Sequence, residues 1–148
     1  MKIYIGTDHN GFELKNKLRD YLTKHGYDVV DGGNEKLDPN DDFPVFAAKV
    51  VNDMLASSDQ DAKGILICGS GQGMCMAANR FKGIRAGLAW DKESAKAGRN
   101  DDDSNILCLP SRMIDTETAK SIVQTWLDTP FAGAPRFSRR IKEMDDLS

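Results

Sequence analysis

The alternation of short apolar runs with longer amphipathic stretches constrains the fold of this chain more than any other feature of its sequence. Five apolar runs predict strands, at residues 2–7, 28–31, 64–68, 84–89 and 105–109. Stretches with helical periodicity follow them, at residues 10–24, 42–55, 73–80, 92–99 and 115–127. Five strand–helix units in succession predict an α/β fold: a three-layer αβα sandwich around a five-stranded parallel sheet, Rossmann-like in its arrangement.

Length and composition indicate a single globular domain. A chain of 148 residues is long enough to build a full core. Its 40% hydrophobic and 29% charged residues are an ordinary globular balance. We therefore expect one domain over residues 1–148, ended by a helix at about 136–146. The net charge of −3 argues against nucleic-acid binding, and no apolar run is long enough to cross a membrane.

The cysteines bear on location and on metal binding. Cys68, Cys75 and Cys108 are odd in number, and no secretory signal precedes them. These features predict reduced thiols and a cytoplasmic location. The chain has no CxxC pair and no Cys/His cluster, so we expect no metal site.

The segment 68–73, Cys-Gly-Ser-Gly-Gln-Gly, is the strongest local signal for chemistry. It lies where the third strand meets its helix, and its glycines allow a tight turn that brings backbone N–H groups close to a ligand. The turn can hold an anion, stabilise a developing oxyanion and favour a thiolate at Cys68. The alternative, a buried strand-end cysteine before a structural turn, stays open.

Other loops could join this turn, because ligands of such folds gather at the carboxyl ends of the strands. The rule predicts one site shared by residues 8–9, 68–73, 99–103 and 110–112. Asp8 and His9 could bind hydroxyls and phosphate or move protons, and Asp8 could equally cap the following helix. The acidic run 101–103 is weak evidence for a metal, and a solvated loop is the alternative.

Four arginines are candidate phosphate ligands, because a guanidinium binds phosphate oxygens with two donors. They are Arg112, Arg136, Arg139 and Arg140. Ordinary surface charge is the alternative for each. A nucleotide- or flavin-binding domain fits less well, since the first strand is not followed by G-x-G-x-x-G and no Gly-Lys-Ser/Thr is present.

These motifs together resemble the B-type ribose-5-phosphate isomerases and the related galactose-6-phosphate isomerase subunits. The resemblance runs nearly end to end. It rests on residues 6–9, 11–12, 42–44, 65–73, 77–80, 83–86, 104–107 and 111–112, and on the spacing of Arg136 and Arg140. It implies interconversion of an aldose phosphate and its ketose phosphate, without a cofactor. Ribose 5-phosphate is the expected substrate, which would place the chain in the pentose phosphate pathway.

The resemblance also implies a role for each site residue. Cys68 would remove the proton from C2 of the open-chain sugar and return it to C1, and Ser70 would help to move hydroxyl protons. Some members of the family use a glutamate as the base instead of the cysteine. This chain has Met74 at that position, and a methionine cannot act as a base. Backbone N–H groups of Gly69, Gly71 and Gly73 would hold the enediolate oxygen.

The resemblance implies substrate-binding roles as well. Asp8 would contact sugar hydroxyls, and the phosphate ligands would be His9, Arg112, Arg136 and Arg140. Family members place the site between two subunits, so a homodimer or a tetramer is expected.

One departure from the family pattern concerns ring opening. Ribose-specific members carry a His-Asn pair where this chain has Asp101 and Asp102. An aspartate cannot donate a proton near neutral pH as an imidazolium does, although it can accept one. Ring opening could therefore use Asp101, fall to Asp8 or His9, or proceed unassisted. Galactose 6-phosphate or allose 6-phosphate stays open as the substrate, and so does a subunit that needs a different partner chain.

Overall fold

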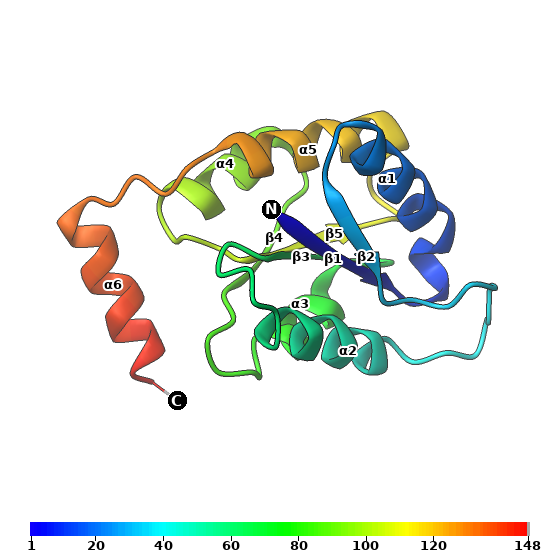
Figure 1. Ribbon diagram of the computed structural model, residues 1–148, viewed down its shortest axis with the longest axis horizontal. Coiled ribbons are helices and arrows are strands. Elements are labelled where there is room, and N and C mark those ends of the chain that lie inside the picture. The colour runs from blue at the N-terminus through cyan, green and yellow to red at the C-terminus, as the bar shows by residue number, and fades with distance from the viewer. Residues whose placement is uncertain (148) are drawn as a thin grey trace.

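The computed structural model describes residues 1–147 and confirms the α/β sandwich (Figure 1). Ser148, the last residue of the predicted domain, lies outside this range. One parallel sheet has the strand order β2-β1-β3-β5-β4. Its strands are β1 (Lys2–Thr7), β2 (Asp28–Asp31), β3 (Lys63–Cys68), β4 (Ala86–Leu88) and β5 (Ile106–Pro110). In the central register, Ile5 pairs with Ile65 and Ile65 pairs with Leu107.

Helices cover both faces of this sheet (Figure 1). One face carries α1 (Phe12–Lys24), α4 (Lys92–Asn100) and α5 (Thr116–Asp128). The other face carries α2 (Phe43–Leu55) and α3 (Gln72–Ala78). A last helix, α6 (Pro135–Asp145), lies beside the sandwich and has no buried residue. None of the helices within residues 1–147 is long and apolar enough to cross a bilayer.

The central strands are buried on both sides, as a parallel sheet between two helix layers requires. Successive side chains of a strand point to opposite faces. In β3, Ile65 and Ile67 therefore pack under the layer of α1, α4 and α5, whereas Leu66 and Cys68 pack against α2 and α3. This burial on two sides holds the sheet in place between the helix layers, and with it the loops that follow the strands.

Two element boundaries differ from the sequence prediction because side chains replace regular backbone partners. Residues His9–Gly11 form a 3-10 turn, η1, before α1, since the Asp8 side chain accepts the N–H of Asn10 at 3.0 Å. β4 is shorter than the predicted 84–89, since the Arg85 N–H donates to Asn105 Oδ1 at 2.8 Å rather than to a strand.

The predicted place of the segment 99–103 is wrong. The carboxyl-edge rule grouped it with the loop after Cys68. However, α4 follows β4 and must return the chain to the start of the next parallel strand, so it ends at the amino edge of the sheet. There, the Arg85 side chain donates to the carbonyl oxygen of Asp103 at 3.0 Å, just before β5 begins at Ile106.

Close packing between β1, β3 and η1 generates a stability prediction. A Cβ on Gly11 would overlap Thr7 Oγ1 and Ile67 Cγ2, and these neighbours are fixed because Thr7 Oγ1 donates to the Ile67 carbonyl at 2.8 Å. Gly11→Ala should lower the free energy of unfolding by roughly 1–3 kcal/mol in urea titrations. Gly87→Ala is the control, because its Cβ would lie 3.9 Å from Ser104 and should change stability by less than about 0.5 kcal/mol. Equal losses in both variants would contradict the packing argument.

Candidate active site

The turn after β3 places a cysteine at the carboxyl edge of the sheet. Cys68 is the last residue of β3 and is 6% exposed. Gly71 has a φ of 75°, and a Cβ there would lie 3.1 Å from the carbonyl carbon of Leu109. α3 begins directly afterwards at Gln72, whose N–H donates to Ser70 Oγ at 3.3 Å. The chain therefore turns along a path that only glycine fits at position 71.

Three consecutive backbone N–H groups of this turn have no acceptor within the described residues. They belong to Gly69, Ser70 and Gly71. Such groups can stabilise negative charge as it develops on a substrate oxygen. Gly73, also predicted to contribute, lies against the ring of Phe43, which would be 2.8 Å from a Cβ at that position. The turn thus sets a thiol directly beside donors for an oxyanion.

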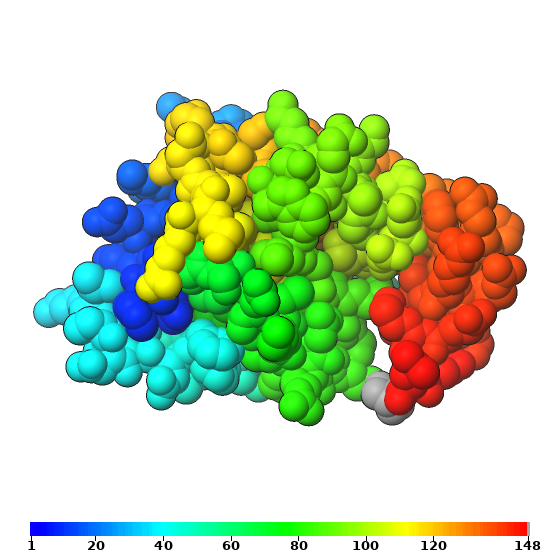
Figure 2. All heavy atoms as spheres, turned by 180° about the vertical axis from the view of Figure 1, so that it is seen from behind, coloured from blue at the N-terminus to red at the C-terminus, as the bar shows by residue number. Residues whose placement is uncertain are grey.

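Hydrogen bonds tie the ends of β1, β3 and β5 together at this edge. The Ser111 N–H donates to the Cys68 carbonyl at 2.9 Å, and Ser111 Oγ donates to the Asn10 carbonyl at 2.8 Å. The Arg112 N–H donates to the Gly69 carbonyl at 3.0 Å, and Arg112 Nη2 donates to Asn10 Oδ1 at 2.8 Å. Figure 2 shows the segments after these three strands, in blue, green and yellow, side by side on one face. A guanidinium is therefore fixed next to the Cys68 turn.

Asp8 and His9 join this group from the end of β1. Asp8 is 5% exposed and caps η1, so its alternative role as a helix cap is confirmed. Asp41 Oδ1 lies 2.9 Å from His9 Nδ1 and accepts the backbone N–H of His9 at 2.9 Å. The side-chain hydrogen bond to Asp41 is the main cause that raises the pKa of His9, against the opposing effect of burial, and the negative charge of Asp8 raises it further. The pair favours a positively charged imidazole at the end of β1.

The other predicted residues, Asp101, Asp102, Arg136 and Arg140, lie elsewhere on the chain. Asp101 and Asp102 follow α4 at the amino edge, and the two arginines are on α6, across the molecule from the Cys68 turn (Figure 2). Burial raises the pKa of Asp102, as does the charge of Asp101, while Arg140 opposes the shift. The strands separate the two groups by roughly 15 Å along their length. One chain therefore holds two halves of the predicted site, at opposite edges of its sheet.

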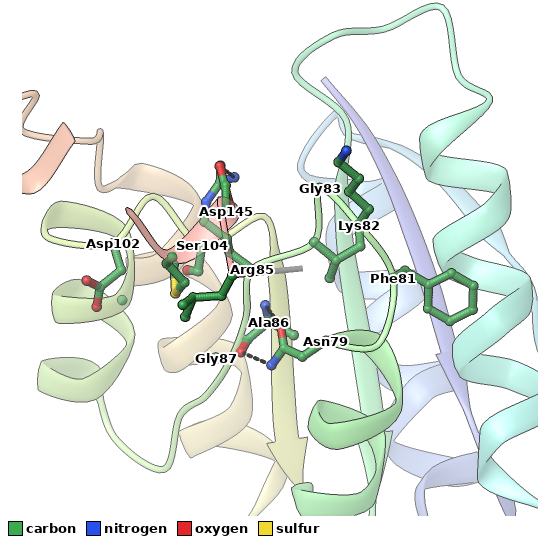
Figure 3. A pocket seen from close by; sticks show the side chains of 14 residues that line it. Asn79, Phe81, Lys82, Gly83, Arg85, Ala86, Gly87, Asp102, Ser104 and Asp145 are labelled. Carbon is green, nitrogen blue, oxygen red and sulfur yellow. Dashed lines mark hydrogen bonds and ion pairs between the residues drawn. The ribbon is translucent and has the colours of Figure 1, made fainter. Parts of the chain in front are cut away.

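A cavity of about 500 Å³ adjoins this second group (Figure 3). It opens between the end of α6 and the start of β4, and Arg85, Asp102 and Asp145 line it. Arg85 Nη1 and Asp145 Oδ2, 3.9 Å apart, link α6 to the sandwich. No residue of α6 is fully buried, so this wall of the cavity is only loosely packed on the sandwich.

Two arginines neutralise one carboxylate of the acidic run 101–103. Asp103 Oδ1 lies 2.8 Å from Arg99 Nη1, and Asp103 Oδ2 lies 3.3 Å from Arg85 Nη2. Within residues 1–147, no three His, Cys, Asp or Glu side chains gather where they could hold a metal ion. Asp103 is therefore part of the polar framework before β5.

Sequence reasoning missed two residues of the carboxyl-edge group. Asn10 accepts a hydrogen bond from Arg112, and Asp41 pairs with His9. Asp41 lies in the polar segment between β2 and α2, outside every strand and helix that the sequence predicts. The signal that could have found it is its place after β2, since β2 neighbours β1 and its following loop reaches the same edge.

Comparison with known proteins identifies the family of this chain. Residues 3–144 match the family model described as Ribose/Galactose Isomerase. A probable ribose-5-phosphate isomerase B of Mycoplasma pneumoniae is 43% identical over 139 residues, which is 94% of this chain and 90% of that protein. The ribose-5-phosphate isomerase B of Mycolicibacterium paratuberculosis is 37% identical over 141 residues, 95% of this chain and 87% of that protein.

Solved structures agree as well. A ribose 5-phosphate isomerase of Thermotoga maritima superposes with a TM-score of 0.92 at 44% identity, covering 99% of this chain and 98% of that one. Ribose-5-phosphate isomerase B from Mycoplasma genitalium, solved with bound ribulose 5-phosphate, superposes with a TM-score of 0.93 at 39% identity, covering 98% and 94%. With its fold and its sequence matched over nearly the whole length, this chain belongs to the Ribose/Galactose Isomerase family.

Proposed function

We propose that this protein interconverts ribose 5-phosphate and ribulose 5-phosphate through an enediolate, with Cys68 as the base. The observation that carries the proposal is the Cys68 turn, where a thiol adjoins three backbone N–H groups that have no acceptor among residues 1–147. The names of the relatives and the ribulose 5-phosphate bound to the Mycoplasma genitalium enzyme support the choice of sugar. Free thiols at all three cysteines fit the cytoplasmic location that we propose with it.

The proposed reaction moves one proton between two carbons. The Cys68 thiolate takes the proton from C2 of the open-chain aldose, and the electron pair of that C–H bond forms the C1=C2 double bond. Negative charge then develops on O1, beside the N–H groups of Gly69 and Gly71. Ser70 assists transfer of the hydroxyl proton from O2 to O1. The Cys68 thiol finally returns its proton to C1, which leaves the carbonyl at C2 and regenerates the thiolate.

The remainder of the substrate would be gripped by charge. Arg112 lies against Gly69 in the Cys68 turn, and His9 follows the neighbouring strand β1; both can hold the phosphate, while Asp8 contacts sugar hydroxyls. A phosphate held at a distance from the reacting carbons keeps C2 over the base. No cofactor enters these steps, because the thiol, the turn and the cationic groups supply the base, the oxyanion donors and the anchor.

We further propose that two copies of the chain combine their opposite edges into each site. Arg136, Arg140, Asp101 and Asp102 of one subunit would then reach the Cys68 turn of the other. α6 fits this role, because it projects from the sandwich and has no fully buried residue. Large apolar side chains on the elements around the carboxyl edge are more than half exposed, as an interface requires: Val45 64%, Met76 66%, Trp90 58% and Met113 71%.

Substrate choice can be tested by initial rates. We expect turnover of ribose 5-phosphate to exceed that of allose 6-phosphate and galactose 6-phosphate by at least about tenfold in kcat/KM, since the relatives are named for ribose. The 6-phosphates are the second candidate, because Asp101 and Asp102 stand where ribose-specific members carry a His-Asn pair. Fast turnover of a 6-phosphate with negligible use of ribose 5-phosphate would reject the proposed substrate.

Replacement of the base gives a second test. Cys68→Ala should lower kcat by a factor of about 10²–10⁴, because a positioned base contributes that much, while the substrate still binds. Cys75→Ala is the matched control: Cys75 donates to the Ala86 carbonyl at 3.2 Å and takes no part in the proposed steps. It should keep close to full activity. Full activity in Cys68→Ala, measured by the same initial rates as the control, would exclude Cys68 as the base.

Mixing of variants tests the shared site. Cys68→Ala and Arg140→Ala homodimers should each be nearly inactive, because every site in each of them lacks one component. Co-expression should restore about a quarter of the wild-type rate, since half of the dimers would be mixed and each would hold one intact site. An inactive mixture that nevertheless forms dimers in size-exclusion chromatography would contradict a site built from both subunits.

A further inference from the structure

The contact between Asp41 and His9 joins two segments that are far apart in sequence. One oxygen, Asp41 Oδ1, lies 2.9 Å from His9 Nδ1 and also accepts the backbone N–H of His9 at 2.9 Å. The Asp41 side chain is only 9% exposed, whereas that of His9 is 33% exposed. A carboxylate so far removed from water is stable when it is paired with a cation. The geometry therefore suits an imidazolium at position 9.

We propose that Asp41 is a positioning residue that holds His9 as an imidazolium, with Nε2 left to bind the substrate phosphate. The inference rests on the proposed function of this site. Because Nδ1–H donates to Asp41, Nε2 is the ring nitrogen that remains for a ligand. His9 lines a cavity of about 510 Å³ together with Asn10 and Ser111, residues that tie the strand ends together beside Cys68. A phosphate at that edge would meet a fixed positive charge from His9 and another from Arg112.

The loop that carries Asp41 is itself anchored to the sandwich. Asn34 Nδ2 donates to Asp41 Oδ2 at 3.3 Å. Lys15 on α1 is 1% exposed, and its Nζ donates to the Asn34 carbonyl at 3.1 Å and to Asp31 Oδ1 at 3.0 Å. A buried ammonium thus holds the loop at its start. This chain of contacts gives Asp41 a defined position before any substrate arrives.

The charges around His9 favour its protonated form. The hydrogen bond to Asp41 is the main cause that raises the pKa of His9, and the charges of Asp8 and Asp41 add to it, while burial opposes it. Other charged groups on the surrounding elements are Glu13 and Lys17 on α1, Asp115 before α5, and Arg112 after β5. Acidic groups outnumber basic ones here. The imidazolium therefore persists above the ordinary pKa of histidine and is lost as the pH rises through the raised pKa.

This arrangement predicts a pH-dependent effect of Asp41→Asn. The amide can still accept a hydrogen bond but carries no charge, so the pKa of His9 should fall. At pH 7.5, the KM for ribose 5-phosphate should rise roughly threefold to tenfold, while kcat stays within about twofold, because only a charge-assisted phosphate contact is lost. Near pH 5.5, where His9 is protonated in both proteins, the KM values should converge. Asp38→Asn, in the same loop and exposed, is the control and should leave KM unchanged.

Proton NMR of the free enzyme provides the direct readout. The chain has two histidines, so its imidazole signals can be assigned with His9→Gln alone. We expect the His9 titration midpoint to fall in Asp41→Asn and the His25 curve to stay where it is, since His25 follows the far end of α1. A midpoint that does not move, or a KM increase that is equal at all pH values, would overturn the proposal.

The test separates this proposal from the proposed function. The NMR titration needs no substrate, and inorganic phosphate can serve as the binding probe across the same pH range. Its affinity should weaken more steeply with pH in Asp41→Asn than in the wild-type protein. If the wild-type protein bound phosphate in this way but did not turn over ribose 5-phosphate, the proposed substrate would fail and the role of Asp41 would stand.

Discussion

The direction of the chain through a parallel sheet is the constraint on which the rest of this structure depends. Every strand must end at the same edge, and every connecting helix must return the chain to the other edge. Loops that follow β1, β3 and β5 therefore meet, and they bring together Asp8, Cys68 and Arg112. Loops that follow the helices meet at the opposite edge, and so Asp101 and Asp102 are placed there. The separation of the site into two halves follows directly from this geometry.

At the carboxyl edge, backbone hydrogen bonds fix the positions of the strand ends relative to one another. Ser111 and Arg112 use their N–H groups to hold the carbonyls of Cys68 and Gly69, and Asn10 is bound from the same side. Those carbonyls are engaged, whereas the N–H groups of Gly69, Ser70 and Gly71 have no acceptor in the described part of the chain. The same ties that fix the strand ends thus leave donors where an enediolate would need them. Rigidity and catalytic capacity have one structural origin.

Each edge of the sheet carries its own set of charged side chains. The carboxyl edge holds Arg112 and the His9–Asp41 pair, and the amino edge holds Asp102 close enough to Arg140 for their charges to interact. In a dimer that joins the two edges, α6 would bring arginines to an anion already partly neutralised by His9 and Arg112. A helix with no buried residue of its own is suited to such a task, because it gives up no core packing to reach a partner.

The sequence by itself determined the fold class, the Cys68 turn and most of the chemical groups, because these depend on periodicity and on short motifs. Strands 2–7 and 28–31 agree with β1 and β2 to the residue, and the turn at 68–73 lies where the glycines indicate. Only the tertiary structure decided which groups share an edge. Residues 99–103 lie away from Cys68, because α4 runs back across the sheet. Asp41 contacts His9, which is 32 positions earlier in the sequence, because β2 lies next to β1. Neither contact leaves a local pattern, since both depend on strand order and helix direction rather than on neighbouring residues.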